Sequence, residues 1–186
     1  MRKTRILAAI ALSAFVGTMA ACDDSGDLTN IDVDEEFAAN LNSLQVIPSP
    51  IGTTGATGVA AMSLIGDVLT VGLSVDGLLS SAVTGAAIHG PTIGNQIAPI
   101  VLDLTPAMVD AITFGALGGR LAVASFDLAV LPVDPNGVLR VDPATLVNML
   151  RSGAAYVQVR TVLNPLGEIR GGVIPQQFQN DNNCCD

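Results

Sequence analysis

The residues best suited to binding a ligand alternate with valines in the segment 156–161. Because successive side chains of a β-strand point to opposite faces, Val157 and Val159 are expected to share the face toward the core. The polar side chains of this segment then share the other face, and they are Tyr156, Gln158 and Arg160. A guanidinium group is a strong donor to carboxylate or phosphate, so this face predicts part of a recognition surface for such a group.

Two other pieces of sequence add polar residues by the same alternation. Glu168 and Arg170 are expected to point outward from one further strand, and His89 from another. Two interpretations remain open for these side chains. Either they form a small recognition patch with Arg160 and Arg170 as donors, or Glu168 forms a cross-strand ion pair with Arg160 beside a solvated His89.

The motifs of common enzymes are missing from the sequence. It has no G-x-S-x-G nucleophile elbow, no P-loop and no dinucleotide fingerprint, and its single His has no Ser or Cys partner suggested by spacing. One His also excludes a multi-His metal site within one chain. We therefore predict no catalytic residue, no metal site and no cofactor. Carboxylate pairs for glycoside hydrolysis are not excluded, although the chain has no Trp and one Tyr to stack against a sugar.

The composition is acidic and poor in aromatic residues. The 186 residues include 17 Asp and Glu against 8 Lys and Arg, which gives a formal net charge of −9, and 3% are aromatic. This charge argues against nucleic acid or anionic lipid as the main partner. Three of the 8 basic residues lie within the first five positions, and the rest are arginines that follow residue 119. The positive charge of the body of the chain is therefore confined to its C-terminal half.

The N-terminus has the pattern of an export signal. Residues 1–21 combine a positive start with an uncharged run, Ile6 to Ala21, which is shorter than the roughly 20 residues of a membrane-spanning helix. The residues Met19-Ala20-Ala21-Cys22 resemble a bacterial lipobox, so we expect Cys22 to be lipidated and to anchor the protein in a membrane. Ordinary cleavage that leaves Cys22 as a free thiol is the alternative. Lipidation predicts an extracytoplasmic protein of the bacterial cell envelope, facing the periplasm or the cell surface.

Two polar segments flank the predicted domain. Residues 22–36 carry seven acidic side chains and are expected to form an extended, self-repelling tether. A calcium site within 32–36 is the alternative, although the glycine and the ligand spacing of an EF-hand are missing. Residues 176–186 are expected to form a flexible polar tail. The adjacent Cys184 and Cys185 lack the C-x-x-C spacing of a redox or zinc site, and the alternative for them is an intermolecular or metal-related role.

Between these segments, an alternation of period two recurs and predicts an all-β domain over residues 37–175. The clearest hairpin joins 60–64 to 69–76 through a Gly66-Asp67 turn. The other predicted strands are 38–46, 82–89, 100–104, 119–131, 137–141, 154–163 and 168–174. Many short strands separated by Gly-rich turns indicate an antiparallel sandwich or barrel, and the sandwich is the expected form.

One or two short helices are expected among these strands. One begins at Thr105-Pro106, with Thr105 as N-cap and Pro at the first helical position. The other begins at Asp142-Pro143 and ends at Gly153.

Three segments carry a family resemblance. The first is Leu41 to Gly58, a strand followed by turns marked by Pro and Gly, and the second is Ala86-Ala87-Ile88-His89-Gly90-Pro91. The third is Tyr156-Val157-Gln158-Val159-Arg160-Thr161 followed by Asn164 to Gly171. The second resembles A-H-I-H-G-P and the third Y-V-N-V-H-T…P-x-G-E-I-R-G, which are patterns of the chordin-type (CHRD) domain family. The resemblance covers residues 37–175 and implies an antiparallel immunoglobulin-like (Greek-key) β-sandwich.

The strand pairing implied by that resemblance would bring six polar side chains onto one surface. They are His89, Tyr156, Gln158, Arg160, Glu168 and Arg170. The family often has His at the positions of Ala87, His89 and Arg160, a grouping suited to a metal. Because Arg160 is cationic at any accessible pH and cannot be a ligand, an inherited metal centre is not expected here.

These patterns together predict a lipid-anchored envelope protein. Its domain is expected to be a non-catalytic binding or structural module for an unidentified envelope or extracellular partner. One alternative is a metal-assisted envelope enzyme of a redox type that uses His89 with carboxylates. Another is a spacer or packing unit with no specific ligand.

Overall fold

The computed structural model describes residues 35–52, 55–78, 83–92, 96–108 and 118–176, and the structural statements below concern these residues. The predicted signal peptide, the lipidated Cys22 and the tether up to residue 34 lie outside them. So do residues 177–186 of the predicted tail, with Cys184 and Cys185. Among the described residues, no helix is long and apolar enough to cross a membrane.

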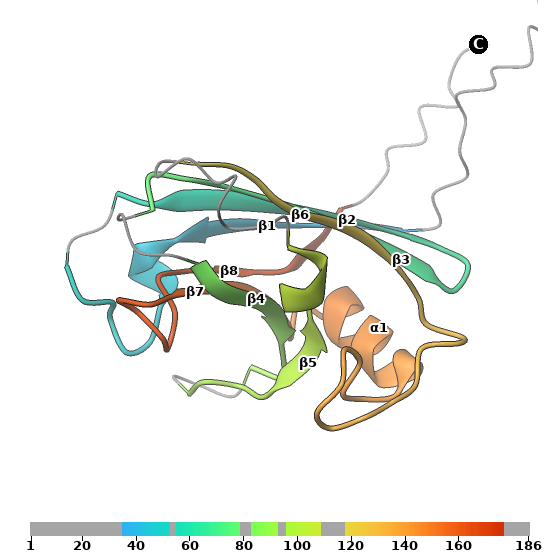
Figure 1. Cartoon of the computed structure of the whole chain (residues 1–186). Coiled ribbons are helices and arrows are strands. Elements are labelled where there is room, and N and C mark those ends of the chain that lie inside the picture. Colours follow the sequence, from blue (N-terminus) through green and yellow to red (C-terminus); the bar gives the residue numbers. More distant parts are fainter. Residues whose placement is uncertain (1–34, 53–54, 79–82, 93–95, 109–117, 177–186) are drawn as a thin grey trace, which may run out of the picture. The chain divides into compact units, whose positions relative to one another are not determined.

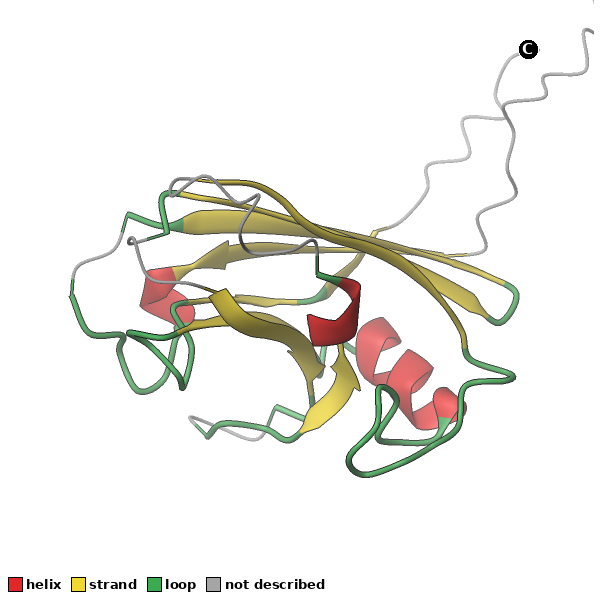
Figure 2. Ribbon diagram, viewed as in Figure 1, coloured by secondary structure: helices red, strands yellow, loops and turns green. Residues whose placement is uncertain are grey.

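The domain is built on one sheet of nine strands whose pairings are antiparallel (Figures 1 and 2). Its order is β5-β4-β7-β8-β1-β2-β3-β6, and β9 pairs with β1 beside this path. The strands are β1 (Glu35–Asn42), β2 (Thr57–Ile65), β3 (Val68–Asp76), β4 (Val83–His89), β5 (Ile100–Asp103), β6 (Gly118–Asp127), β7 (Tyr156–Thr161), β8 (Ile169–Gly172) and β9 (Ile174–Gln176). The prediction of an all-β, antiparallel domain is confirmed.

The two-sheet sandwich expected from the resemblance is not the arrangement that the strands adopt. They form a single curled half-barrel sheet, because β1 is hydrogen-bonded on both of its edges. On one edge it pairs with β2 from Glu35↔Leu64 to Asn42↔Thr57, and on the other with β9 and with Arg170 of β8. Curling lets the two halves of the sheet face each other without a break between them.

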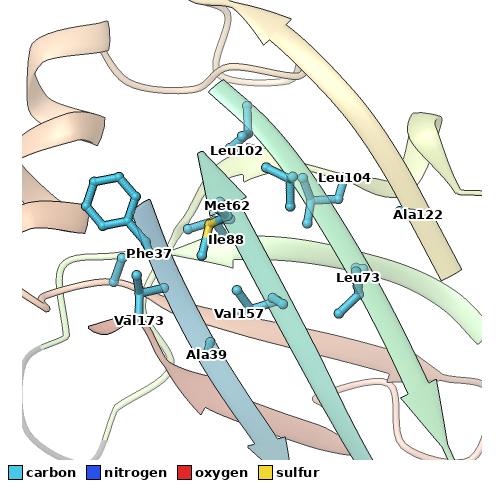
Figure 3. Close-up of a cluster of buried hydrophobic side chains, with 14 of the residues drawn as sticks. Phe37, Ala39, Met62, Leu73, Ile88, Leu102, Leu104, Ala122, Val157 and Val173 are labelled. Atoms are coloured by element: carbon cyan, nitrogen blue, oxygen red, sulfur yellow. The ribbon is translucent and has the colours of Figure 1, made fainter. Parts of the chain in front are cut away.

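The core lies inside this curl, where apolar side chains from both halves meet (Figure 3). Along β1, Phe37, Ala39 and Leu41 are buried, in the period-two pattern expected from the sequence. Ile88 of β4 and Val157 of β7 reach the same cluster from the other half of the sheet. Each fully buried aliphatic side chain of this kind contributes about 1.5–3 kcal/mol to folding, so the core fixes which face of β4, β7 and β8 points inward.

One α-helix, α1 (Pro143–Arg151), packs against this core, as the sequence predicts. Asp142 caps it by accepting hydrogen bonds from the Thr145 hydroxyl and, over 2.9 Å, from the Thr145 backbone N–H, and these two bonds lower the pKa of the Asp142 carboxyl. Leu146 and Leu150 are its buried side chains. Shorter 3₁₀ turns occur at Ser43–Gln45 (η1) and Thr105–Ala107 (η2).

Two local expectations differ from the structure. Leu104, not Thr105, occupies the N-cap position of η2, which has no side-chain cap. The predicted strand 137–141 is reduced to isolated bridges of Leu139 with Leu102 and Val133, because a turn closed by Asp134 precedes it directly.

Strand β1 begins two residues before the predicted domain boundary at residue 37. Glu35 and Glu36, which the sequence assigned to the tether, are the first residues of β1. The carboxylate of Glu35 accepts hydrogen bonds from Arg151 at the end of α1, with Nε–Oε distances of 3.0 and 2.8 Å. This contact joins the start of the domain to its helix.

Candidate functional site

The polar residues singled out in the sequence meet on the face of β4, β7 and β8 that is turned away from the core, called here the outer face. Antiparallel register places His89 opposite Tyr156, Gly85 opposite Arg160, and Gln158 opposite Arg170. The inward neighbours Ile88, Val157, Val159 and Ile169 belong to the core. The side chains of His89, Tyr156, Gln158, Arg160 and Arg170 therefore share one face, as the alternation predicts.

Tyr156 is the centre of this group. Its ring is stacked on the imidazole of His89, with ring centroids 4.9 Å apart and an angle of 4° between the planes. The guanidinium carbon of Arg170, on the opposite neighbouring strand, lies 3.4 Å from the Tyr156 ring centroid in a cation–π contact. The chain contains one Tyr and one His, and these two are in direct contact.

The outer face is buried, whereas one of the two interpretations of the sequence expected a solvated His89. Relative exposure is 4% for His89, 1% for Tyr156 and Gln158, and 8% for Arg170, while Arg160 is half-buried. Two loops cover these side chains. Ala98, which precedes β5, donates its backbone N–H to the Tyr156 hydroxyl over 3.0 Å, and Leu166, in the β7–β8 turn, accepts a 2.7 Å hydrogen bond from Gln158 Nε2.

The β7–β8 turn is itself held in place. The Asn164 side-chain oxygen accepts a 2.6 Å hydrogen bond from the backbone N–H of Ile51, which fastens the loop after β1 to this turn. Gly167 lies so close to Gln158 that an added Cβ would be 2.7 Å from the Gln158 Cδ atom. Its φ of 127° is also a conformation that side-chain-bearing residues rarely adopt.

His89 is held in one orientation and one tautomer. Its Nδ1 lies 2.8 Å from the carbonyl oxygen of Ala98, and since a carbonyl only accepts, Nδ1 carries the proton. Burial lowers the pKa of His89, and the positive charges of Arg160 and Arg170 lower it further, against the opposing effects of the Ala98 hydrogen bond and of Asp103. The imidazole is therefore neutral at pH 7, and its Nε2 offers a lone pair.

Four buried polar atoms of this face have no hydrogen-bond partner among the described residues. They are His89 Nε2, Gln158 Oε1, Arg160 Nε and Arg170 Nη1. A buried polar group without a partner costs about 1–3 kcal/mol, and more when it is charged. Most buried polar groups in folded proteins are satisfied, so four such atoms on one face are an unusual concentration.

Arg160 reaches its position because residue 85 is a glycine. A Cβ added at Gly85 would lie 2.7 Å from Arg160 Nη2 and 2.8 Å from Thr105 Oγ1. The guanidinium group therefore extends over β4 at this point, between β7 and η2. No local sequence pattern indicates this role of Gly85, since the role depends on a register between distant strands.

Glu168 is the sixth residue that the sequence assigned to this face. It is fully buried, and its Oε2 accepts a 2.7 Å hydrogen bond from the Thr161 hydroxyl. Two arginines are used in ion pairs, Arg140 with Asp103, at 2.9 Å, and Arg151 with Glu35. The other two arginines with described side chains, Arg160 and Arg170, lie on the outer face.

Asp103 is a neighbour of this site that the sequence interpretation did not include. It lies opposite Ala87 in the register of β5 with β4, and its carboxylate is held by Arg140. The outer loops carrying Ala98 and Leu166 were not anticipated either. No pattern in their local sequence predicts that these loops fold back over the outer face.

The residues of this face do not fit a metal ion. Ala87, His89 and Arg160, the positions that a metal centre would require, do lie on it together, but they supply one imidazole and one fixed positive charge. Among the described residues, no group of three or more His, Cys, Asp or Glu side chains could hold a metal. With Arg170 also present, the local charge favours an anion.

Comparison with known proteins gives one match. A protein-family model described as CHRD domain matches residues 37–173, from the third residue of β1 to the residue after β8. No curated protein and no solved structure matches the chain.

Proposed function

The chain belongs to the CHRD domain family, and from that premise we propose that it is a lipid-anchored binding module of the bacterial cell envelope. In this proposal Cys22 carries the lipid, and the outer face of β4, β7 and β8 binds an envelope or extracellular partner without chemical change. The single observation that carries the binding role is the set of four buried polar atoms without partners on that face.

The surroundings of His89 favour binding over catalysis. Its Nδ1 is bonded to Ala98, its ring stacks on Tyr156, and its Nε2 has no hydrogen-bond partner among the described residues, so the imidazole is not hydrogen-bonded to a described nucleophile. A general base or a triad needs the imidazole to contact the group from which it takes a proton. The side chains of this face are instead locked by stacking and by backbone hydrogen bonds, which suits recognition of a fixed shape.

The experiment is crosslinking of the native lipoprotein in envelope preparations, followed by affinity capture and identification of what is bound. An Arg160→Ala, Arg170→Ala double variant is expected to lose the captured partner, because both cationic donors are removed. Arg151→Ala is the matched control, since Arg151 pairs with Glu35 away from the outer face. Circular dichroism melting checks that each variant is folded, and Arg160→Gln serves alone if the double variant is not. Unchanged capture by a folded variant contradicts the proposal.

A metal-assisted enzyme of a redox type is the alternative that one observation favours. In metal sites a ligating His commonly donates its other ring N–H to a carbonyl, as His89 does to Ala98. The positive charges of Arg160 and Arg170 and the lack of further ligands on the face weigh against it. Elemental analysis of the purified chain tests this alternative. Stoichiometric metal in the parent chain that is lost in His89→Gln supports a metal-assisted enzyme, and a parent chain without stoichiometric metal contradicts it.

A further inference from the structure

We infer that the outer face binds a carboxylate that bears neighbouring hydroxyl groups, such as a hydroxy acid or a uronic acid. This inference rests on the proposed binding function and names the ligand class for the same site. The ligand class follows from the chemistry of the four buried atoms without partners, because two of them are hydrogen-bond donors and two are acceptors.

Two of the four atoms are donors on cations. Arg160 Nε and Arg170 Nη1 each have an N–H to offer, and both are buried. Hydrogen bonds from a guanidinium to a carboxylate are about twice as strong as those between neutral groups. An anionic group on the ligand would satisfy both arginines and offset the positive charge that burial makes unfavourable.

The other two atoms are acceptors. Gln158 uses its Nε2 on Leu166, and its Oε1 remains without a partner. His89 donates through Nδ1 to Ala98, so Nε2 is an acceptor as well. The ligand must therefore also bring donors, and hydroxyl groups are donors that leave its negative charge intact.

The presence of acceptors beside the donors favours a carboxylate over a phosphate as the anionic group of the ligand. A phosphate has further anionic oxygens, which would face Gln158 Oε1 or the His89 Nε2 lone pair and be repelled. A carboxylate has two oxygens, which matches the two cationic donors. The four side chains come from three adjacent strands, β4, β7 and β8, and neighbouring strands lie about 4.8 Å apart.

The least buried side of the group lies at Arg160. Arg160 is half-buried, whereas His89, Gln158 and Arg170 are buried at 4%, 1% and 8% exposure. A ligand would reach the carboxylate donors from this side, with its hydroxyl groups directed toward Gln158 and His89.

The test uses the purified full chain and four probes of similar size. Galacturonate has the carboxylate and the hydroxyls, galactose has the hydroxyls, cyclohexanecarboxylate has the carboxylate, and galactose 6-phosphate replaces the carboxylate by a phosphate. We expect galacturonate to bind at least tenfold more tightly than each of the other three, by titration calorimetry. Equal affinity for any of those three overturns the inference.

A second measurement reports on the site itself. Because the chain has one His, its imidazole nitrogens give unambiguous NMR signals in an untagged protein. Galacturonate is expected to shift the Nε2 signal, and Arg160→Ala to weaken its binding at least tenfold, while Arg151→Ala leaves it unchanged. An unshifted Nε2 signal, or equal weakening by Arg151→Ala, contradicts the inference.

Two further probes identify the source of the ligand. Tighter binding of an oligogalacturonate than of gluconate indicates an acidic polysaccharide, and the reverse indicates a free hydroxy acid. If no probe binds but envelope capture is still lost in the arginine variants, the ligand class is wrong and the binding function stands. If capture is also unaffected, the binding function fails with it.

Discussion

At the scale of single residues, Tyr156 is the side chain that connects the other groups of the outer face. In a chain with 3% aromatic residues, its one Tyr stacks on its one His and also contacts Arg170. The Tyr156 hydroxyl accepts from Ala98 N–H, and the Ala98 carbonyl accepts from His89, so the loop before β5 is held by both rings. Loop, rings and guanidinium therefore form one connected unit.

His89 makes the stability of the domain depend on pH. Its pKa in the folded state is lowered below the ordinary 6.5 by burial, and then by Arg160 and Arg170. The unfolded chain then binds the proton more readily, so the free energy of unfolding is full above pH 6.5 and falls as the pH drops toward the folded-state pKa. Urea unfolding between pH 7.5 and 5.5 measures this fall.

The control for that measurement is His89→Gln. Because the chain has no other His, no other side chain has an ordinary pKa inside this window, and the variant is expected to show a flat stability profile. A variant that keeps the slope of the parent chain would show that another group is responsible.

At the scale of elements, the β7–β8 turn decides whether Gln158 can face a ligand. Gly167→Ala combines an unfavourable backbone conformation with a contact against Gln158 Cδ, so it is expected to lower the free energy of unfolding by about 1–3 kcal/mol. It should also displace Gln158 from Leu166 and weaken ligand binding. Thermal unfolding and the galacturonate titration measure the two effects.

Gly119→Ala provides a matched comparison for Gly167→Ala. Gly119 has a similar φ of 138°, but nothing lies within 4 Å of an added Cβ there. Its substitution therefore reports the backbone strain without the contact, and it should leave ligand binding intact. If the two variants lose the same stability and binding, the contact with Gln158 has no role.

The elements themselves could be predicted from the sequence, but their assembly could not. Alternation located the β2–β3 hairpin, and the Asp142-Pro143 start located α1, because both are local patterns. The single sheet depends on β1 pairing with both β2 and β8, which are far apart in the sequence. No local pattern distinguishes this arrangement from two facing sheets.

The same limit applies to the site. Alternation correctly placed His89 and Arg170 on one face, since the core fixes the inward residues. It could not show that loops carrying Ala98 and Leu166 bury that face, nor that Glu168 turns to Thr161. Polar residues at outward positions look the same in a sequence whether water or a loop covers them.

At the scale of the whole molecule, the arginines of the C-terminal half have two different structural roles. Arg140 and Arg151 are used in ion pairs that hold the fold, with Asp103 and Glu35. Arg160 and Arg170 are concentrated on the outer face. In an otherwise acidic chain, these two cations give the outer face a local charge that favours an anionic group.

The proposed lipid anchor is tested on the whole protein by intact mass. Lipidation predicts that the purified protein is heavier than the unmodified chain beginning at Cys22 by the mass of its acyl groups. Cys22→Ser is expected to abolish this increment and to release the protein from membranes on fractionation. A mass that equals unmodified cleavage after Ala21 would refute lipidation.

The position of β1 has a mechanical consequence. The segment that leads from Cys22 enters the sheet at Glu35, and β1 is an interior strand bonded along its whole length to β2 and on its other edge to β9 and β8. A pull on Glu35 along the axis of β1 would load these hydrogen bonds together and would not open them one after another. In the lipid-anchored protein that we propose, tension between the membrane and a bound partner would therefore enter the domain at a strand that resists unfolding.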